Sequence, residues 1–345
     1  KDKNYVNEIY PKPVITSLVY SPKLRKWGAY IDKYIIFKNK LRNFLKVNYD
    51  LIHITDHSNA VYLKDISKYS NSRTLITCHD LIAIRQSKDH FNDSPKISTT
   101  GKILQDWIYQ SLFFADYYAC DSRQTQEDLI QLIPKTKKKS EIINLGTDLI
   151  VKRSTQKQLK TYIQFDILKG NFIIHVGNAC WYKNRITVFR AFKKAKERFK
   201  DLKLVLIGPK PQNSELDDDL CYWFLKNVRD IIVFENISDG ELKNLYSYAK
   251  VLLFPSIIEG FGWPPLEAAI FGCHVITSKT GAIFDLLGNY AIYIEPNDQE
   301  SISKALLNTL SINKRKIPKV DLPTYEMCAK NYCNLYKKII KKLDL

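Results

Sequence analysis

The sequence predicts an α/β protein built from two doubly wound domains, each a parallel sheet with helices on both faces. Two observations lead to this class. Short segments of continuous Val, Ile, Leu and Phe alternate with longer amphipathic segments, and the alternation appears in both halves of the chain. The length of 345 residues is sufficient for two domains of ordinary size.

The second half shows the alternation most clearly. Strands are expected at 171–177, 202–208, 230–236, 251–256, 274–278 and 291–296. The segments 184–199 and 239–250 between them have helical periodicity. Strands that are apolar throughout are buried on both faces, so we expect a parallel sheet covered by helices on both sides.

The first half repeats the pattern less regularly. Strands are expected at 14–20, 51–55, 74–81, 117–122 and 141–145, and helices at 101–115 and 123–133. We interpret 151–170 as the linker that enters the second domain, and the amphipathic segment 324–343 as a last helix that returns to the first domain. The predicted domains are therefore 1–160, 161–320 and a C-terminal helix at 321–345.

The chain is strongly basic, with 53 Lys and Arg against 36 Asp and Glu, a net charge of +17. Residues 23–46 hold eight basic side chains and one acidic side chain, and residues 311–345 hold nine and three. Solvated lysine-rich helix faces are the leading interpretation. Peripheral contact with an anionic membrane comes second, and nucleic-acid binding is the least favoured.

The lack of a targeting signal and the scattered cysteines favour a cytoplasmic protein with reduced thiols. No apolar run approaches the length of a membrane span, and no signal-peptide pattern opens the chain. The seven cysteines are scattered without a C-x-x-C pair, so we expect free thiols and no zinc site. The sequence starts at Lys1 and its only methionine is Met327, so we expect the natural start to lie outside it.

The segment "SIIEGFGWPPLEAAIFGC", 256–273, predicts an anion site. An apolar strand ends there at glycines that permit close backbone approach, and a helix opens at Pro264 and Pro265, which suit a first helical turn. Exposed backbone N–H groups and the positive helix end attract phosphate. Glu259 and Glu267 lie on either side of this turn, so each is placed to reach a different part of one ligand.

Several motifs in one order resemble the donor domain of retaining family 4 glycosyltransferases of the GT-B fold. In the second half these are "HVGNACWYKN", "LVLIGP", "LYSYAKVLLFPSIIEGFGWPPLEA" and "EPND", with Glu259 and Glu267 as the family's E-x7-E. In the first half "TCHDL", "ADYYACDSRQTQEDL" and "IINLGTD" agree with it. The resemblance implies two Rossmann-like domains facing each other across a cleft, and a nucleotide-sugar donor.

The resemblance also implies roles for the residues of the second half. Glu267 is expected to bond the ribose and Glu259 to face the transferred sugar. Gly260, Phe261 and Gly262 are expected to bind the donor's diphosphate.

Lys183 is placed to supply positive charge to the leaving diphosphate. Gly177 and Asn178 precede it in the same turn and are expected to contact the donor, although many relatives carry arginine where Asn178 stands. Arg185 is a candidate to supply the missing charge, and a solvated Arg185 is an equal alternative.

His79 and Ile237 complete the predicted site. His79 ends the expected strand 74–81, and the resemblance implies contact with the donor sugar and the reacting centre. Ile237 matches a position near the nucleotide base, while a core role is equally compatible. Because such enzymes use front-face attack, with the leaving phosphate accepting the acceptor's proton, no protein base is assigned.

No metal or other cofactor is expected. His53 and His57 straddle the end of a strand, and the run Asp217 to Asp219 is interpreted as solvated.

The predicted function is transfer of a hexosyl group, with retention, from a nucleotide sugar to a glycan or lipid-linked acceptor in bacterial surface polysaccharide synthesis. One alternative is a GT-B epimerase that rearranges a nucleotide sugar. Another is a non-catalytic basic protein that binds nucleic acid. Relatives carry a first strand and a glycine-rich loop before the position of Val14, and we expect this sequence to lack both.

Overall fold

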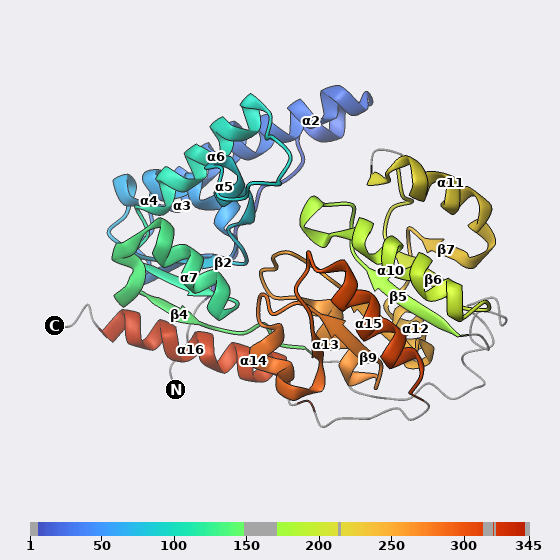
Figure 1. The fold of residues 1–345 in the computed structure, drawn as a ribbon. Helices are drawn as coiled ribbons and strands as arrows, with labels where there is room; N and C mark the ends of the chain where they lie inside the picture. The colour runs from blue at the N-terminus through green and yellow to red at the C-terminus, as the bar shows by residue number, and fades with distance from the viewer. Residues whose placement is uncertain (1–5, 148–170, 213–214, 313–319, 321, 342–345) are drawn as a thin grey trace. The chain divides into compact units, whose positions relative to one another are not determined.

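The computed structural model describes residues 6–147, 171–212, 215–312, 320 and 322–341. The chain divides into two compact units that are interleaved in sequence. Unit 1 comprises 1–78, 99–119 and 334–345, and unit 2 comprises 79–98 and 120–333. The linker predicted at 151–170 lies outside the described residues. Figure 1 shows the elements of both units.

Unit 2 contains a six-stranded sheet of order β10-β9-β8-β5-β6-β7 with parallel neighbours. All six strands predicted for the second half are present. Their bounds are β5 Phe172–Val176, β6 Lys203–Ile207, β7 Ile231–Phe234, β8 Val251–Phe254, β9 His274–Thr277 and β10 Ile292–Tyr293.

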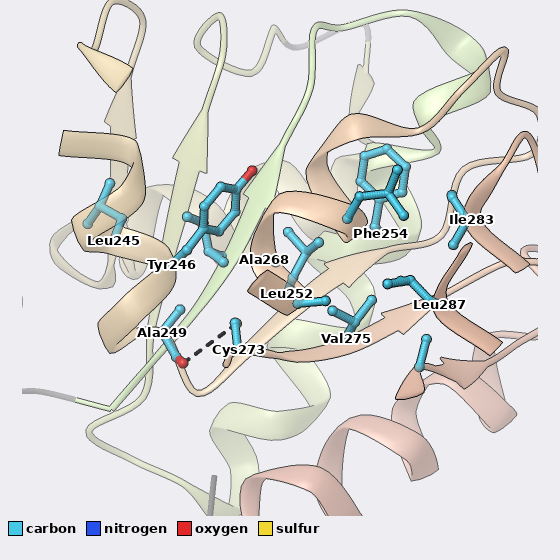
Figure 2. Close-up of a cluster of buried hydrophobic side chains, with 14 of the residues drawn as sticks. Leu245, Tyr246, Ala249, Leu252, Phe254, Ala268, Cys273, Val275, Ile283 and Leu287 are labelled. Atoms are coloured by element: carbon cyan, nitrogen blue, oxygen red, sulfur yellow. Dashed lines mark hydrogen bonds between the residues drawn. The ribbon is translucent and has the colours of Figure 1, made fainter. Parts of the chain in front are cut away.

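Helices cover both faces of this sheet. Alternate strand residues point to opposite sides, so neighbouring residues of one strand pack in different clusters. Ile174, Leu252 and their neighbours belong to one buried cluster, which continues into α12 (Asp239–Tyr248), α13 (Trp263–Ile270) and α14 (Ile283–Leu287). Figure 2 shows this cluster. Ile173 and Leu253 belong to a second cluster. That cluster includes residues of α10 (Arg185–Arg198), α11 (Asp218–Lys226) and α15 (Gln299–Leu310). The predicted doubly wound arrangement is confirmed.

The other sheet has the order β1-β2-β3-β4. Its strands are β1 Leu51–Ile54, β2 Arg73–Cys78, β3 Tyr117–Cys120 and β4 Ser140–Ile142, which are four of the five predicted for the first half. β1 and β2 are parallel, with Leu51 opposite Arg73. The predicted helices appear as α6 (Thr99–Leu112) and α7 (Arg123–Leu132). Also present are α4 (Leu63–Tyr69), α5 (Ile82–Ser87) and the short 3₁₀ helices η2 (His57–Tyr62) and η3 (Pro134–Lys138).

The strand predicted at 14–20 is wrong: Ile15–Leu18 form the short helix α1. The carboxylate of Asp32 accepts hydrogen bonds from the backbone N–H groups of Val14, Ile15 and Thr16 at 3.0, 2.7 and 2.9 Å. These are the donors that a helix start leaves unpaired, so a distant side chain overrides the β preference of this apolar segment.

A helical run that the sequence pattern did not predict follows α1. It comprises α2 (Pro22–Ile31), the π-helical segment η1 (Asp32–Ile36) and α3 (Phe37–Phe44).

The last helix, α16 (Tyr325–Lys341), is amphipathic as predicted. Leu335 and Ile339 are buried, and the Tyr336 hydroxyl lies 2.7 Å from Nδ1 of His53 on β1. The other ring nitrogen of His53 lies 2.8 Å from Oγ1 of Thr77. His53 therefore takes part in packing. Among the described helices, none combines the length and the apolar character that a membrane span requires.

Candidate active site

The turn between β8 and α13 presents consecutive free backbone N–H groups. Gly262 is the N-cap of α13 and has the left-handed backbone φ of 91°. Within the described part of the chain, the backbone N–H groups of Gly260, Phe261, Gly262 and Trp263 have no hydrogen-bond partner. Such a run of amides at a helix start suits an anion. The helix begins at Trp263, and Pro264 and Pro265 stand in its first turn as predicted. Because the prolines have no N–H, the available donors lie mainly before the helix.

Gly260 is required for close packing against the backbone of His79. A Cβ atom at position 260 would lie 2.2 Å from the carbonyl oxygen of His79 and 2.9 Å from Cβ of Asp80. Phe261 is buried, and its carbonyl oxygen accepts a hydrogen bond from the N–H of Ala282 at 2.9 Å. The turn is therefore held by a core side chain while its amides stay unpaired.

Glu259 and Lys183 form an ion pair at this turn. Nζ of Lys183 lies 2.7 and 2.9 Å from the two carboxylate oxygens of Glu259, and both side chains are largely buried. The N–H of Glu259 donates to Oγ1 of Thr280 at 2.9 Å, which fixes its backbone. Burial raises the pKa of Glu259, and the ammonium of Lys183 opposes that shift.

Glu267 has a different partner. It lies on α13 and accepts a hydrogen bond at 3.1 Å from the hydroxyl of Tyr246 on α12. The ring of Tyr246 belongs to the cluster in Figure 2. Burial raises the pKa of Glu267, and the hydroxyl of Tyr246 opposes that shift. The two glutamates therefore sit in separate environments on either side of the turn, each with its own hydrogen-bond donor.

Lys183 ends the turn that follows β5. A Cβ atom at Gly177 would lie 3.4 Å from Nε2 of His175 and from the side-chain carbons of Lys183. Asn178 is exposed, and its side-chain oxygen accepts from the N–H of Cys180 at 3.2 Å. Burial lowers the pKa of His175 to about 4, so this imidazole is neutral at pH 7.

Arg185 is buried, and the solvated alternative is wrong. Its guanidinium donates to the carbonyl oxygen of Pro209 at 2.9 Å and lies 3.5 Å from the carboxylate of Glu215. Burial lowers the pKa of Arg185, and Glu215 opposes that shift. The guanidinium of Arg185 is thus bound to Pro209 and Glu215 in the loop that follows β6.

His79 follows β2 and is paired with a buried carboxylate. Its Nδ1 lies 2.6 Å from Oδ2 of Asp121, which follows the neighbouring strand β3. The His79 side chain is 41% exposed and that of Asp121 is 1% exposed, so the carboxylate orients a ring that solvent can reach. Asn144 donates to the backbone carbonyl of Asp121 at 2.8 Å. Asp121 was not predicted from the sequence, although its place after a parallel strand is a usable signal.

Other predicted residues have structural surroundings. Ile237 is half-buried and packs against the cluster of Figure 2. Asp217 caps α11, and its second carboxylate oxygen pairs with Arg190 at 2.8 Å. No group of three His, Cys, Asp or Glu side chains suited to a metal ion occurs in the described ranges.

Contacts thus join Lys183 to Glu259 and Gly177, and Glu259 is continuous with the turn Gly260, Phe261 and Gly262. The backbone of His79 lies against Gly260. In the described part of the chain, no hydrogen bond, ion pair or ring contact joins Glu267, Asn178 or Ile237 to Lys183 or Glu259.

Sequence comparison matches the segment that holds Lys183, Glu259 and Glu267. Residues 160–319 match the family model described as Glycosyl transferases group 1. An O-antigen chain mannosyltransferase of Salmonella typhimurium is 34% identical over 140 residues, 41% of this chain and 38% of the relative. An uncharacterized glycosyltransferase of Methanocaldococcus jannaschii is 31% identical over 176 residues, 48% of this chain and 44% of the relative. The matches thus span less than half the length of these relatives.

Structural comparison covers nearly the whole chain. The sucrose-phosphate synthase of Thermosynechococcus elongatus has a TM-score of 0.66 at 20% identity, over 94% of this chain and 82% of that structure. A UDP-forming trehalose-phosphate synthase of Burkholderia xenovorans has a TM-score of 0.62 at 12% identity, over 93% and 80%. The chain therefore has the GT-B fold of these solved enzymes. The predicted resemblance to glycosyltransferases is confirmed over residues 160–319 by the match to Glycosyl transferases group 1.

Proposed function

We propose that this chain is a retaining hexosyltransferase that moves a sugar from a nucleotide-sugar donor to a glycan or lipid-linked acceptor without a metal. The single observation that carries the proposal is the ion pair of Lys183 and Glu259 beside four consecutive unpaired amides, at 260–263. This arrangement offers positive charge and directed N–H donors on one side, and a carboxylate acceptor for sugar hydroxyls on the other.

The diphosphate of the donor is the group that this turn fits. Backbone amides and an ammonium stabilise charge that grows on phosphate oxygens as the bond to the sugar breaks. Glu259 accepts hydrogen bonds from hydroxyls of the transferred sugar, close to the same ammonium. Glu267, held by Tyr246, accepts from the ribose.

Transfer then proceeds on one face of the sugar. The bond between the anomeric carbon and the diphosphate oxygen breaks, and its electron pair stays on the diphosphate. The acceptor hydroxyl bonds to the same carbon from the same face, and its proton passes to the departing phosphate oxygen. His79, oriented by Asp121, contacts the donor sugar at the reacting centre, and positioning supplies much of the rate.

The relatives support a role in polysaccharide synthesis. One is named as an O-antigen chain mannosyltransferase, and another, 28% identical over 143 residues, as a capsular polysaccharide biosynthesis glycosyltransferase of Staphylococcus aureus. A third relative, 27% identical over 184 residues, is named as a 2-deoxystreptamine N-acetyl-D-glucosaminyltransferase of Niallia circulans. The donors to test first are therefore nucleotide-activated mannose and N-acetylglucosamine, each with and without EDTA.

The test is turnover of Lys183→Met and Glu259→Gln on the best donor of such a panel. Lys183→Met removes one charge-stabilising donor and is expected to lower kcat about 10²- to 10³-fold. Lys194→Met, on the exposed face of α10, is the matched control and should keep full activity. The anomeric configuration of the product, read by NMR, should equal that of the donor.

Removing one partner of a buried ion pair can also unfold a protein. The double variant Lys183→Met/Glu259→Gln leaves no unpaired charge, so it should remain folded by circular dichroism and stay inactive. Wild-type turnover in both single variants would refute the site. Isomerised donor in the absence of acceptor would show an epimerase instead.

A further inference from the structure

A basic pocket lies in unit 1, outside the candidate active site. Its cavity of about 220 Å³ is lined by Lys38, Arg42, Val61, Lys64, Asp65, Lys68, Tyr69 and Trp107. Four cations thus surround one carboxylate. Asp65 pairs with Lys38 at 2.9 Å and with Arg42 at 3.4 Å. Lys64 and Lys68 have no ion-pair partner among the described residues, so the pocket keeps an excess of positive charge.

Aromatic rings form part of the pocket wall. The guanidinium carbon of Arg42 and Nζ of Lys68 each lie 5.3 Å from the ring centre of Tyr69. These cation–π contacts hold the charges over an apolar surface. Trp107, on α6, is 43% exposed at the pocket edge.

An exposed apolar stripe runs along α2 and η1, which lead into α3, and continues on α6. Leu24, Trp27, Ile31 and Ile35 are 59, 67, 38 and 59% exposed and follow one another at intervals of three or four residues along α2 and η1. Such spacing places them on one helix face. On α6, Ile103 lies four residues before Trp107 and is 65% exposed. α2, η1 and α6 all belong to unit 1, and α2 and α6 are labelled in Figure 1.

A chain of ring contacts joins the stripe to the pocket. Ring centres are 6.1 Å apart for Trp27 and Tyr30, 5.7 Å for Tyr30 and Tyr34, and 5.2 Å for Tyr34 and Trp107. Trp107 also lines the pocket. The stripe and the pocket therefore form one continuous surface, apolar and aromatic at one end and cationic at the other.

We propose that this surface binds the anionic face of a phospholipid bilayer. The basic pocket takes the phosphate of a lipid headgroup, and the apolar stripe enters the boundary between headgroups and acyl chains. Trp and Tyr favour this boundary, amphipathic helices lie in it, and Lys and Arg are attracted to anionic lipid. The inference goes beyond sugar transfer and is measured without donor or acceptor.

Two other partners fit the surface less well. The centre of a protein–protein interface is depleted in lysine, whereas lysines supply three of the four cations here. Single-stranded nucleic acid uses cations and aromatic stacking but gains nothing from exposed aliphatic side chains such as Leu24, Ile31 and Ile35. A lipid surface interacts favourably with the cations, the aromatic rings and the exposed aliphatic side chains at once.

The experiment is sedimentation of the full chain with vesicles of phosphatidylcholine alone or with phosphatidylglycerol. Binding is expected only with the anionic lipid and is expected to weaken as NaCl rises. Lys64→Gln/Lys68→Gln should weaken it about 30-fold, since each lysine near the headgroups contributes on the order of 1 kcal/mol. Lys137→Gln/Lys138→Gln, two exposed lysines of η3, removes the same charge and should bind like wild type. Trp27→Ser should weaken binding and leave the salt dependence unchanged.

Any of the following results would overturn the proposal. One is a vesicle result: either equal binding to neutral and anionic vesicles, or equal losses of binding in the two lysine-pair variants. A second is a concentration-dependent dimer in sedimentation velocity that Trp27→Ser dissociates, which would make the surface a contact between copies of this chain. A third is tight binding of single-stranded RNA that Lys64→Gln/Lys68→Gln abolishes while vesicles do not bind.

Discussion

At the scale of single residues, Gly260 sets how closely His79 approaches the turn between β8 and α13. Gly260→Ala is expected to cost about 1–3 kcal/mol of unfolding free energy, because the new Cβ would lie 2.2 Å from the carbonyl oxygen of His79. Turnover should fall as well, since relief of the clash moves either the histidine or the amides. Urea denaturation and initial rates measure both effects.

Gly240 provides the matched control. It lies in α12, and a Cβ atom there would meet only Oγ of Ser238, at 4.0 Å. Gly240→Ala should therefore stabilise the chain by about 0.5–1 kcal/mol. Equal stability for the two alanine variants would contradict the packing argument.

Glu259, Lys183 and Gly260 could be predicted because they lie in short local motifs around glycines and strand ends. The residues that hydrogen-bond to the site could not be predicted. Asp121 is 42 residues from His79, and Thr280 is 21 residues from Glu259. Such pairs are set by the order of strands in a sheet, which periodicity does not contain.

At the scale of elements, α16 shows how one amphipathic helix is anchored. Ile339→Ala is expected to cost about 2–5 kcal/mol, because Ile339 is fully buried. Lys337→Ala, two residues earlier on the exposed face, should change stability by less than about 0.5 kcal/mol. Thermal unfolding of both variants checks the difference, and comparable losses would show that α16 does not pack through this face.

Helix and strand positions were predictable where the pattern was long and regular. The six strands β5 to β10 of the larger sheet were all predicted because they are mostly apolar and bounded by turn residues. The segment 14–20 was not, since four hydrogen bonds to Asp32 from Val14, Ile15 and Thr16 stabilise a helical turn in an apolar sequence. The local preference for a strand is overridden here because a side chain distant in sequence accepts hydrogen bonds from the backbone N–H groups.

At the scale of the whole molecule, the net charge of +17 opposes compactness through self-repulsion. Raising the salt from about 0.01 to about 0.15 M shortens the screening length from about 30 to about 8 Å. The melting temperature should therefore rise over this interval. Calorimetry in NaCl measures it, with Lys137→Glu/Lys138→Glu as the comparison, because that variant lowers the net charge by four.

The variant should show a smaller rise than wild type. A melting temperature that falls with salt in both proteins would mean that local ion pairs outweigh the overall repulsion.

The pairing of Lys183 with Glu259 has a consequence for selectivity among anions. An anion that competes for this ammonium must first displace a carboxylate held at 2.7 Å. Inorganic phosphate, which has no sugar to offer the released glutamate, gains little from the exchange. A ligand that offers an anion to Lys183 and hydroxyl groups to Glu259 satisfies both charges, so the ion pair should favour such a ligand over inorganic phosphate.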